Sequence, residues 1–93
     1  MSNVVVITGA ATGLGRATAL KLAKEQYKLV VVDFNEVEGQ NTVNMAVQLG
    51  AEAIFVKADV SNEEDVKAYV AKAVEAFGTI NYFLNNAGIM VPF

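Results

Sequence analysis

Two patterns of apolar residues alternate along the 93-residue chain. Short, unbroken apolar runs rich in β-branched side chains are typical of strands that a parallel sheet buries on both faces. Between these runs, apolar residues return every three or four positions, which is the spacing of amphipathic helices. The expected strands cover 4–8, 29–33, 53–58 and 80–84, and the expected helices run over 14–25, between Asn35 and Gly50, and between Ser61 and Gly78.

Local signals mark the ends of these helices. Asn35 is expected to cap the second helix, and Gly50 to end it. Ser61 followed three residues later by Glu64 predicts a capping box at the start of the third helix, which Gly78 ends. Inside the second helix, the residues Gly39 and Thr42 are poor helix formers, so we expect it to be weaker than its neighbours.

The alternation of strands and helices predicts an α/β fold. Parallel strands joined by right-handed crossovers would lie in the spatial order 3-2-1-4, as half of a doubly wound sheet. Ligands of such sheets bind at the switch point, here between the first and fourth strands. Residues 1–93 form one domain in this prediction, and the apolar tail from Ile89 to Phe93 has no element of its own.

A glycine-rich turn joins the first strand to the first helix. Gly9, Gly13 and Gly15 follow the pattern G-x-x-x-G-x-G and directly precede the helix. Such a turn can be a tight connection only. It can also hold a phosphate, because the first amide groups of a helix and its positive dipole end attract anions. The turn and the stretch Asn85–Gly88 both open onto the switch point, which favours a pyrophosphate site.

Asp33 ends the second strand, near the position of a carboxylate that holds an adenosine ribose. A carboxylate there accepts hydrogen bonds from ribose hydroxyls and repels a 2′-phosphate, so the prediction is NAD rather than NADP. No Lys or Arg occupies 10–12, 34 or 35, and Arg16 lies one turn into the helix. The alternative is a solvated aspartate at a strand end.

Two further strand ends carry candidate site residues. Asp59 could help to start the third helix, or it could accept a hydrogen bond from an adenine amino group while Val60 covers the ring. The spacing favours neither. In Asn85-Asn86-Ala87-Gly88 the amides can tie neighbouring strands, and the small residues leave room for a ribose against the backbone. We expect both roles.

Composition limits the chemistry. The chain has no cysteine and no histidine, and its acidic residues are scattered, so neither thiolate chemistry nor a metal site is indicated. The net charge of -3 without a basic cluster gives no sign of nucleic acid or membrane partners. No leader or membrane span is evident, and we expect a cytoplasmic protein. Tyr27, Tyr69 and Tyr82 lack a Lys four residues on and are interpreted as packing residues.

Together these motifs resemble the short-chain dehydrogenase/reductase family in its NAD-dependent form. The resemblance covers the whole chain and implies a Rossmann fold and the oxidoreductase chemistry of alcohols and ketones. It implies pyrophosphate contacts from the glycine turn, an adenosine ribose on Asp33, and adenine or ribose contacts from the other strand ends. The implied cofactor-binding residues are Gly9, Thr12, Gly13, Leu14, Gly15, Asp33, Phe34, Asp59, Val60, Asn85, Ala87 and Gly88.

The sequence departs from the family after Phe93. Family members continue with further strands, a catalytic Ser and a Tyr-x-x-x-Lys pair, none of which is present here. The chain therefore resembles the N-terminal cofactor-binding half of such an enzyme, expected to be inactive alone. The alternatives are a working oxidoreductase whose remaining half is supplied elsewhere, and a structural fragment that binds no nucleotide.

Self-association is a further expectation. The fourth strand would be central in a longer sheet, and here it would be an edge with an unpaired ladder. Hydrophobic residues make up 54% of the chain and charged residues only 18%. We therefore expect a homo-oligomer, formed through that edge or through an apolar face.

Overall fold

The computed structural model describes residues 3–85 and 90–92. Five strands and three helices make up this part of the chain. In chain order they are β1 (Val4–Thr8), α1 (Gly13–Lys24), β2 (Lys28–Asp33), α2 (Glu36–Gln48), β3 (Ala53–Lys57), α3 (Glu63–Phe77), β4 (Tyr82–Leu84) and β5 (Met90–Pro92). None of the helices in the described residues is long and apolar enough to cross a membrane.

The sheet has the order β3-β2-β1-β4-β5. The first four strands are parallel, with Val6 of β1 opposite both Val30 of β2 and Phe83 of β4. The predicted order 3-2-1-4 is therefore confirmed. Because these strands are parallel, their carboxyl ends meet at one edge of the sheet, where the glycine turn and Asp33 also lie.

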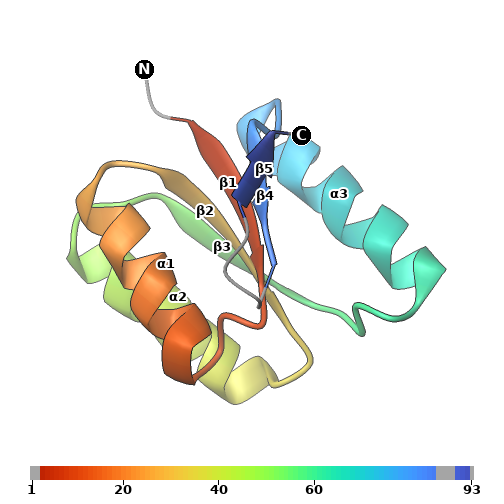
Figure 1. Cartoon of the computed structure of the whole chain (residues 1–93), viewed down its shortest axis with the longest axis horizontal. Coiled ribbons are helices and arrows are strands. Elements are labelled where there is room, and N and C mark those ends of the chain that lie inside the picture. The colour runs from red at the N-terminus through yellow and green to blue at the C-terminus, as the bar shows by residue number, and fades with distance from the viewer. Residues whose placement is uncertain (1–2, 86–89, 93) are drawn as a thin grey trace.

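The sheet separates two apolar cores. Figure 1 shows α1 and α2 on one side of the sheet and α3 on the other. Helices α1 and α2 cover one face, with Leu22 and Val43 packed against strand residues such as Val31. Helix α3 covers the other face, where Tyr69 and Ala73 pack against the strands. Strands β1 and β2 are apolar on both faces because both faces are covered, as the unbroken apolar runs predicted.

The predicted caps are only partly correct. The Asn35 side chain accepts a hydrogen bond from the Glu38 N–H, and Gly78 ends α3 with a left-handed backbone, both as expected. The predicted capping box of Ser61 and Glu64 is wrong. The N-cap of α3 is Asn62, whose side chain accepts from the Asp65 N–H at 3.1 Å.

The C-terminal tail also differs from the prediction. Residues 90–92 form β5, which pairs antiparallel with β4, Phe83 opposite Val91. The free side of β4 is thus paired over its full length, so the prediction of an unpaired β4 edge is wrong. A short apolar tail has no helical or strand signature of its own, but a neighbouring unpaired ladder supplies hydrogen-bond partners for it.

Candidate functional site

The start of α1 differs from that of the other two helices. Thr12 is at its N-cap position but makes no side-chain cap hydrogen bond, and its first turn contains no acidic residue. In the described chain, α2 and α3 begin with a capping asparagine followed by acidic side chains. Side-chain caps and carboxylates occupy the amide groups and offset the dipole of those two helices. At the start of α1, the first amide groups and the positive end of the helix dipole therefore remain available for an anion.

Gly15 holds α1 close to the turn. A Cβ at this position would overlap the carbonyl oxygen of Gly9 and lie 2.7 Å from its carbonyl carbon. The Gly9 N–H donates to the Val32 carbonyl at 2.9 Å, which ties the turn to the end of β2. Glycine at position 15 is therefore required by close approach, and the turn, the helix start and the β2 end form one compact unit.

Asp33 is more than a solvated strand end. Its Oδ2 accepts from the Ala11 N–H at 3.1 Å, and its Oδ1 accepts from the Asn35 N–H at 3.0 Å. These bonds fix the carboxylate beside the glycine turn. A carboxylate offers about four acceptor positions, so Asp33 retains capacity for hydroxyl donors of a ligand.

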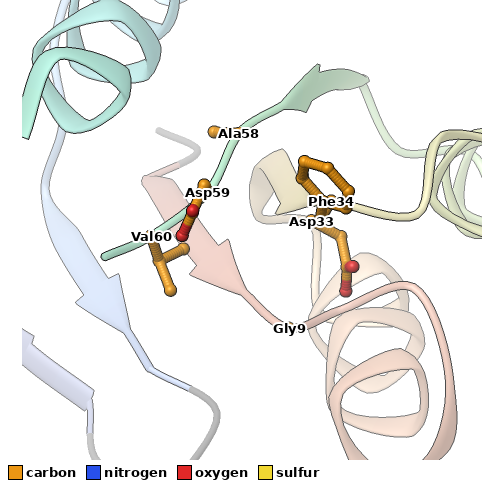
Figure 2. A pocket seen from close by; sticks show the side chains of 6 residues that line it. All are labelled: Gly9, Asp33, Phe34, Ala58, Asp59 and Val60. Atoms are coloured by element: carbon orange, nitrogen blue, oxygen red, sulfur yellow. The ribbon is translucent and has the colours of Figure 1, made fainter. Parts of the chain in front are cut away.

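A pocket of about 340 Å³ opens beside this carboxylate (Figure 2). Its volume lies at the lower end of the ~300–1,000 Å³ of ligand pockets. Figure 2 shows Phe34 and Val60 on opposite sides of the pocket, and both side chains are more than half exposed. Such apolar side chains could hold a flat ring between them. The residues lining the pocket are Gly9, Asp33, Phe34, Ala58, Asp59 and Val60.

Lys57 supplies a cation near this pocket. Its Nζ lies 5.2 Å from the centre of the Phe34 ring. Attraction between an ammonium and an aromatic face is worth ~0.5–1 kcal/mol at exposed sites. This contact favours the observed position of the ring that forms one wall.

Asp59 has a structural role at the start of α3. Its Oδ1 accepts from the Ser61 hydroxyl at 2.6 Å and from the Ser61 N–H at 2.9 Å. These two hydrogen bonds, the hydroxyl first, lower the pKa of the Asp59 carboxyl below its ordinary value, against a smaller effect of burial. Because Asp59 also lines the pocket, the geometry is compatible with an adenine contact as well.

A second, much smaller cavity lies between the ends of β1 and β4. Leu14, Gly15 and Asn85 line it together with strand residues, at the expected switch point. Thr12 and Gly13 are exposed at the turn. Ala87 and Gly88, the other two residues predicted to border a ribose, lie outside the described residues.

The sequence analysis did not identify two residues near the site, Ala58 and Thr42. Ala58 lines the larger pocket, and its place at the end of the third strand could have indicated this. Thr42 is fully buried, and its Oγ1 lies 2.8 Å from the Ala10 carbonyl oxygen. A threonine inside a helix carries no signal for this contact, because the partner is 32 residues away in sequence.

The tyrosines pack as expected. Tyr27 and Tyr82 meet edge to face with ring centres 6.5 Å apart. Tyr69 is buried in the core under α3, and burial raises the pKa of its phenol. Among the described residues, no group of three or more acidic side chains could hold a metal ion.

The comparisons with known proteins agree on one family. Residues 3–93 match the model of the family described as short chain dehydrogenase. Levodione reductase from Leifsonia aquatica is 47% identical over 89 residues, which are 94% of this chain and 33% of that protein. Cyclohexanol dehydrogenase from Acinetobacter sp. is 43% identical over 96% of this chain and 36% of its own length.

Solved structures lead to the same family. A short chain dehydrogenase/reductase from Burkholderia phymatum in complex with NAD has a TM-score of 0.86 and 43% identity, over 89% of this chain and 30% of that one. NAD+-bound xylitol dehydrogenase has a TM-score of 0.87 and 36% identity, over 94% of this chain and 34% of that one. The chain thus spans about a third of the length of these relatives.

Proposed function

The chain belongs to the short-chain dehydrogenase family, and we propose that its 93 residues bind NAD(H) as the N-terminal cofactor-binding segment of such an enzyme. The whole enzyme would transfer a hydride between NAD and an alcohol or ketone. The observation that carries the proposal is the uncapped start of α1, which shares one edge of the sheet with the fixed carboxylate of Asp33.

The proposed arrangement follows the site from one end to the other. The diphosphate binds at the glycine turn, Asp33 holds the adenosine ribose, and the adenine enters between Phe34 and Val60. The second ribose lies near Asn85, beside the smaller cavity. The residues proposed to contact the cofactor are Gly9, Thr12, Gly13, Leu14, Gly15, Asp33, Phe34, Asp59, Val60, Asn85, Ala87 and Gly88.

The charges near Asp33 support NAD over NADP. The carboxylate would repel a 2′-phosphate. Arg16, the basic residue nearest the turn in sequence, donates instead to α2, to the Thr42 hydroxyl and the Glu38 carbonyl. Lys57, the strand partner of Asp33, lies over the ring of Phe34 and is the described cation whose charge works against this preference.

The chain is proposed to be inactive alone. It lacks the Ser and the Tyr-x-x-x-Lys pair that the family resemblance implies, and its tyrosines are packing residues. Without a positioned phenol, no group passes a proton to or from the substrate oxygen. Hydride transfer by the purified chain with any member of a broad alcohol panel would contradict this part of the proposal.

A structural fragment that self-associates without nucleotide is the second candidate. Exposed apolar side chains favour it, among them Val37, Val47 and Val74. Association would use such a surface rather than the β4 edge, because β5 already pairs with that edge. The cytoplasmic location expected from the sequence stays a prediction.

Calorimetric titration with NAD and NADP tests the proposal. The unaltered chain should bind NAD more tightly than NADP. Asp33→Ala should weaken NAD binding ~10-fold or more, since hydrogen bonds to charged groups contribute ~1.5–3 kcal/mol, and should affect NADP much less. Glu52→Ala is the matched control, because it removes a carboxylate next to the amino end of β3, away from the site.

Each result separates the candidates. Asp33 also accepts from the Ala11 N–H, so Asp33→Asn, which keeps an oxygen for that bond, is measured as well. Equal losses for NAD and NADP in both variants would remove the ribose assignment. Absence of binding heat with either nucleotide would favour the structural fragment.

A further inference from the structure

A buried hydroxyl joins α2 to the glycine turn. Thr42 Oγ1 lies 2.8 Å from the Ala10 carbonyl oxygen and 3.2 Å from that of Ala11. The carbonyl of Glu38, four residues earlier in the helix, also lies 3.2 Å away. A threonine inside a helix ordinarily bonds back to that i−4 carbonyl. Here the nearest acceptor belongs to the turn, so the side chain connects two elements.

Arg16 orients this hydroxyl. Its Nε donates to Thr42 Oγ1 at 2.9 Å, and its Nη2 donates to the Glu38 carbonyl at 3.0 Å. A hydroxyl has a single proton to donate. With one lone pair of Oγ1 taken by Arg16, the proton is directed to the turn, and Ala10 is the closest acceptor. The hydrogen bonds therefore run in one direction, from Arg16 through Thr42 to Ala10.

The opposite side of the turn is held by Asp33. Its carboxylate points toward the turn (Figure 2), and its Oδ2 accepts from the Ala11 N–H at 3.1 Å. Residues 10 and 11 are thus held through a carbonyl on the α2 side and through an amide on the β2 side. Carbonyl oxygens drawn toward Thr42 keep the negative ends of their peptide dipoles away from a bound anion, which favours binding without reorganisation.

We propose that Thr42, oriented by Arg16, is a positioning residue of the nucleotide site: it holds the glycine turn and, through Ala11, the Asp33 carboxylate in the binding arrangement before the ligand arrives. This inference rests on the proposed NAD-binding function. Thr42 itself touches no ligand and acts only through the turn.

Three variants test this role. Thr42→Val keeps the shape and removes the hydroxyl, and Thr42→Ser keeps the hydroxyl. Val43→Ala, at the neighbouring buried position of the same helix, is the control for lost stability alone. The measurements are the dissociation constants of NAD and of adenosine by calorimetry, and the exchange rate of the Ala11 amide by NMR without nucleotide.

The expected result is specific to the turn. Thr42→Val should raise the NAD dissociation constant ~3–10-fold, as expected for one lost hydrogen bond, with a smaller change for adenosine. It should also speed exchange at Ala11. Thr42→Ser should restore both values, and Val43→Ala should lower stability only. Arg16→Met, at a partly exposed site, should shift both readouts in the same direction and replaces Thr42→Val if that variant does not fold.

The outcomes separate this inference from the proposed function. Unchanged NAD affinity and unchanged Ala11 exchange in Thr42→Val would overturn the positioning role while NAD binding stands. Failure of the unaltered chain to bind NAD would overturn the proposed function. In that case Ala11 exchange still decides whether Thr42 holds the glycine turn: faster exchange in Thr42→Val than in Val43→Ala supports that contact, and equal rates overturn it.

Discussion

Gly15 illustrates how a single residue shapes the site. Its spacing after Gly9 and Gly13 predicts a turn that a ligand can approach. The structure adds that the room at position 15 is taken by the protein itself, because a Cβ would overlap the Gly9 carbonyl. The glycine thus serves the packing of α1 on the turn.

Gly15→Ala should therefore destabilise the chain. Overpacking against backbone costs ~1–3 kcal/mol, since a carbonyl cannot move aside as a flexible side chain can. Ala17→Ser is the control, because it also adds one heavy atom to α1, at an exposed position, where propensity changes the free energy by less than ~0.7 kcal/mol. Urea denaturation measures both. Equal unfolding free energies for the two variants would contradict the close approach.

At the scale of elements, two residues of α2 that weaken a helix in isolation make close tertiary contacts in the structure. Gly39 and Thr42 have low helix propensity. In the structure, Gly39 lets the helix approach the Phe55 ring so closely that a Cβ would overlap it. Thr42 bonds to the turn. Low propensity at these two positions is thus offset by tertiary contacts.

The start of α3 gives a prediction for an element. Asn62→Ala removes the cap of the Asp65 N–H and should lower stability by ~1 kcal/mol. Ser61→Ala should lower it less, because Ser61 bonds to the exposed Asp59 carboxylate and not to the helix. Thermal and urea denaturation would measure both variants. A larger loss of stability in Ser61→Ala than in Asn62→Ala would support the capping box of Ser61 and Glu64 instead.

At the scale of the whole molecule, the residues that the structure describes pack tightly. The Cα radius of gyration is 11.4 Å, against ~12 Å expected for a folded domain of this length. Two cores flank the sheet, and β5 pairs with the strand that would otherwise form an edge. The chain is as compact as a complete domain although it spans about a third of its relatives.

The pairing of β5 leads to a prediction about self-association. Replacing residues 90–93 with Gly-Ser-Gly-Ser keeps the length but lowers strand propensity, so the β4 edge should become unpaired and accept a second chain. Sedimentation equilibrium should show a mass that rises with concentration more steeply than for the unaltered chain. Identical concentration dependence would mean that β5 does not protect this edge.

The sequence by itself determined the order of the first four strands and the three helices, and the parallel arrangement 3-2-1-4. It also predicts the edge at which a ligand would bind, which stays a prediction. These depend on periodicity and glycine placement, which are local and repeat along the chain. The two asparagine positions at helix starts show the limit, because Asn35 was identified as a cap and Asn62 was not. The Ser61 hydroxyl donates to the Asp59 carboxylate and does not cap the helix, and spacing alone does not reveal that contact.

Only the tertiary structure decided the contacts between distant segments. The hydroxyl of Thr42 on Ala10, the carboxylate of Asp33 on Ala11 and the pairing of the tail with β4 each join residues without a shared local signal. Their physical reason is common to all three: a buried or edge polar group needs a partner, and folding determines which one lies within reach.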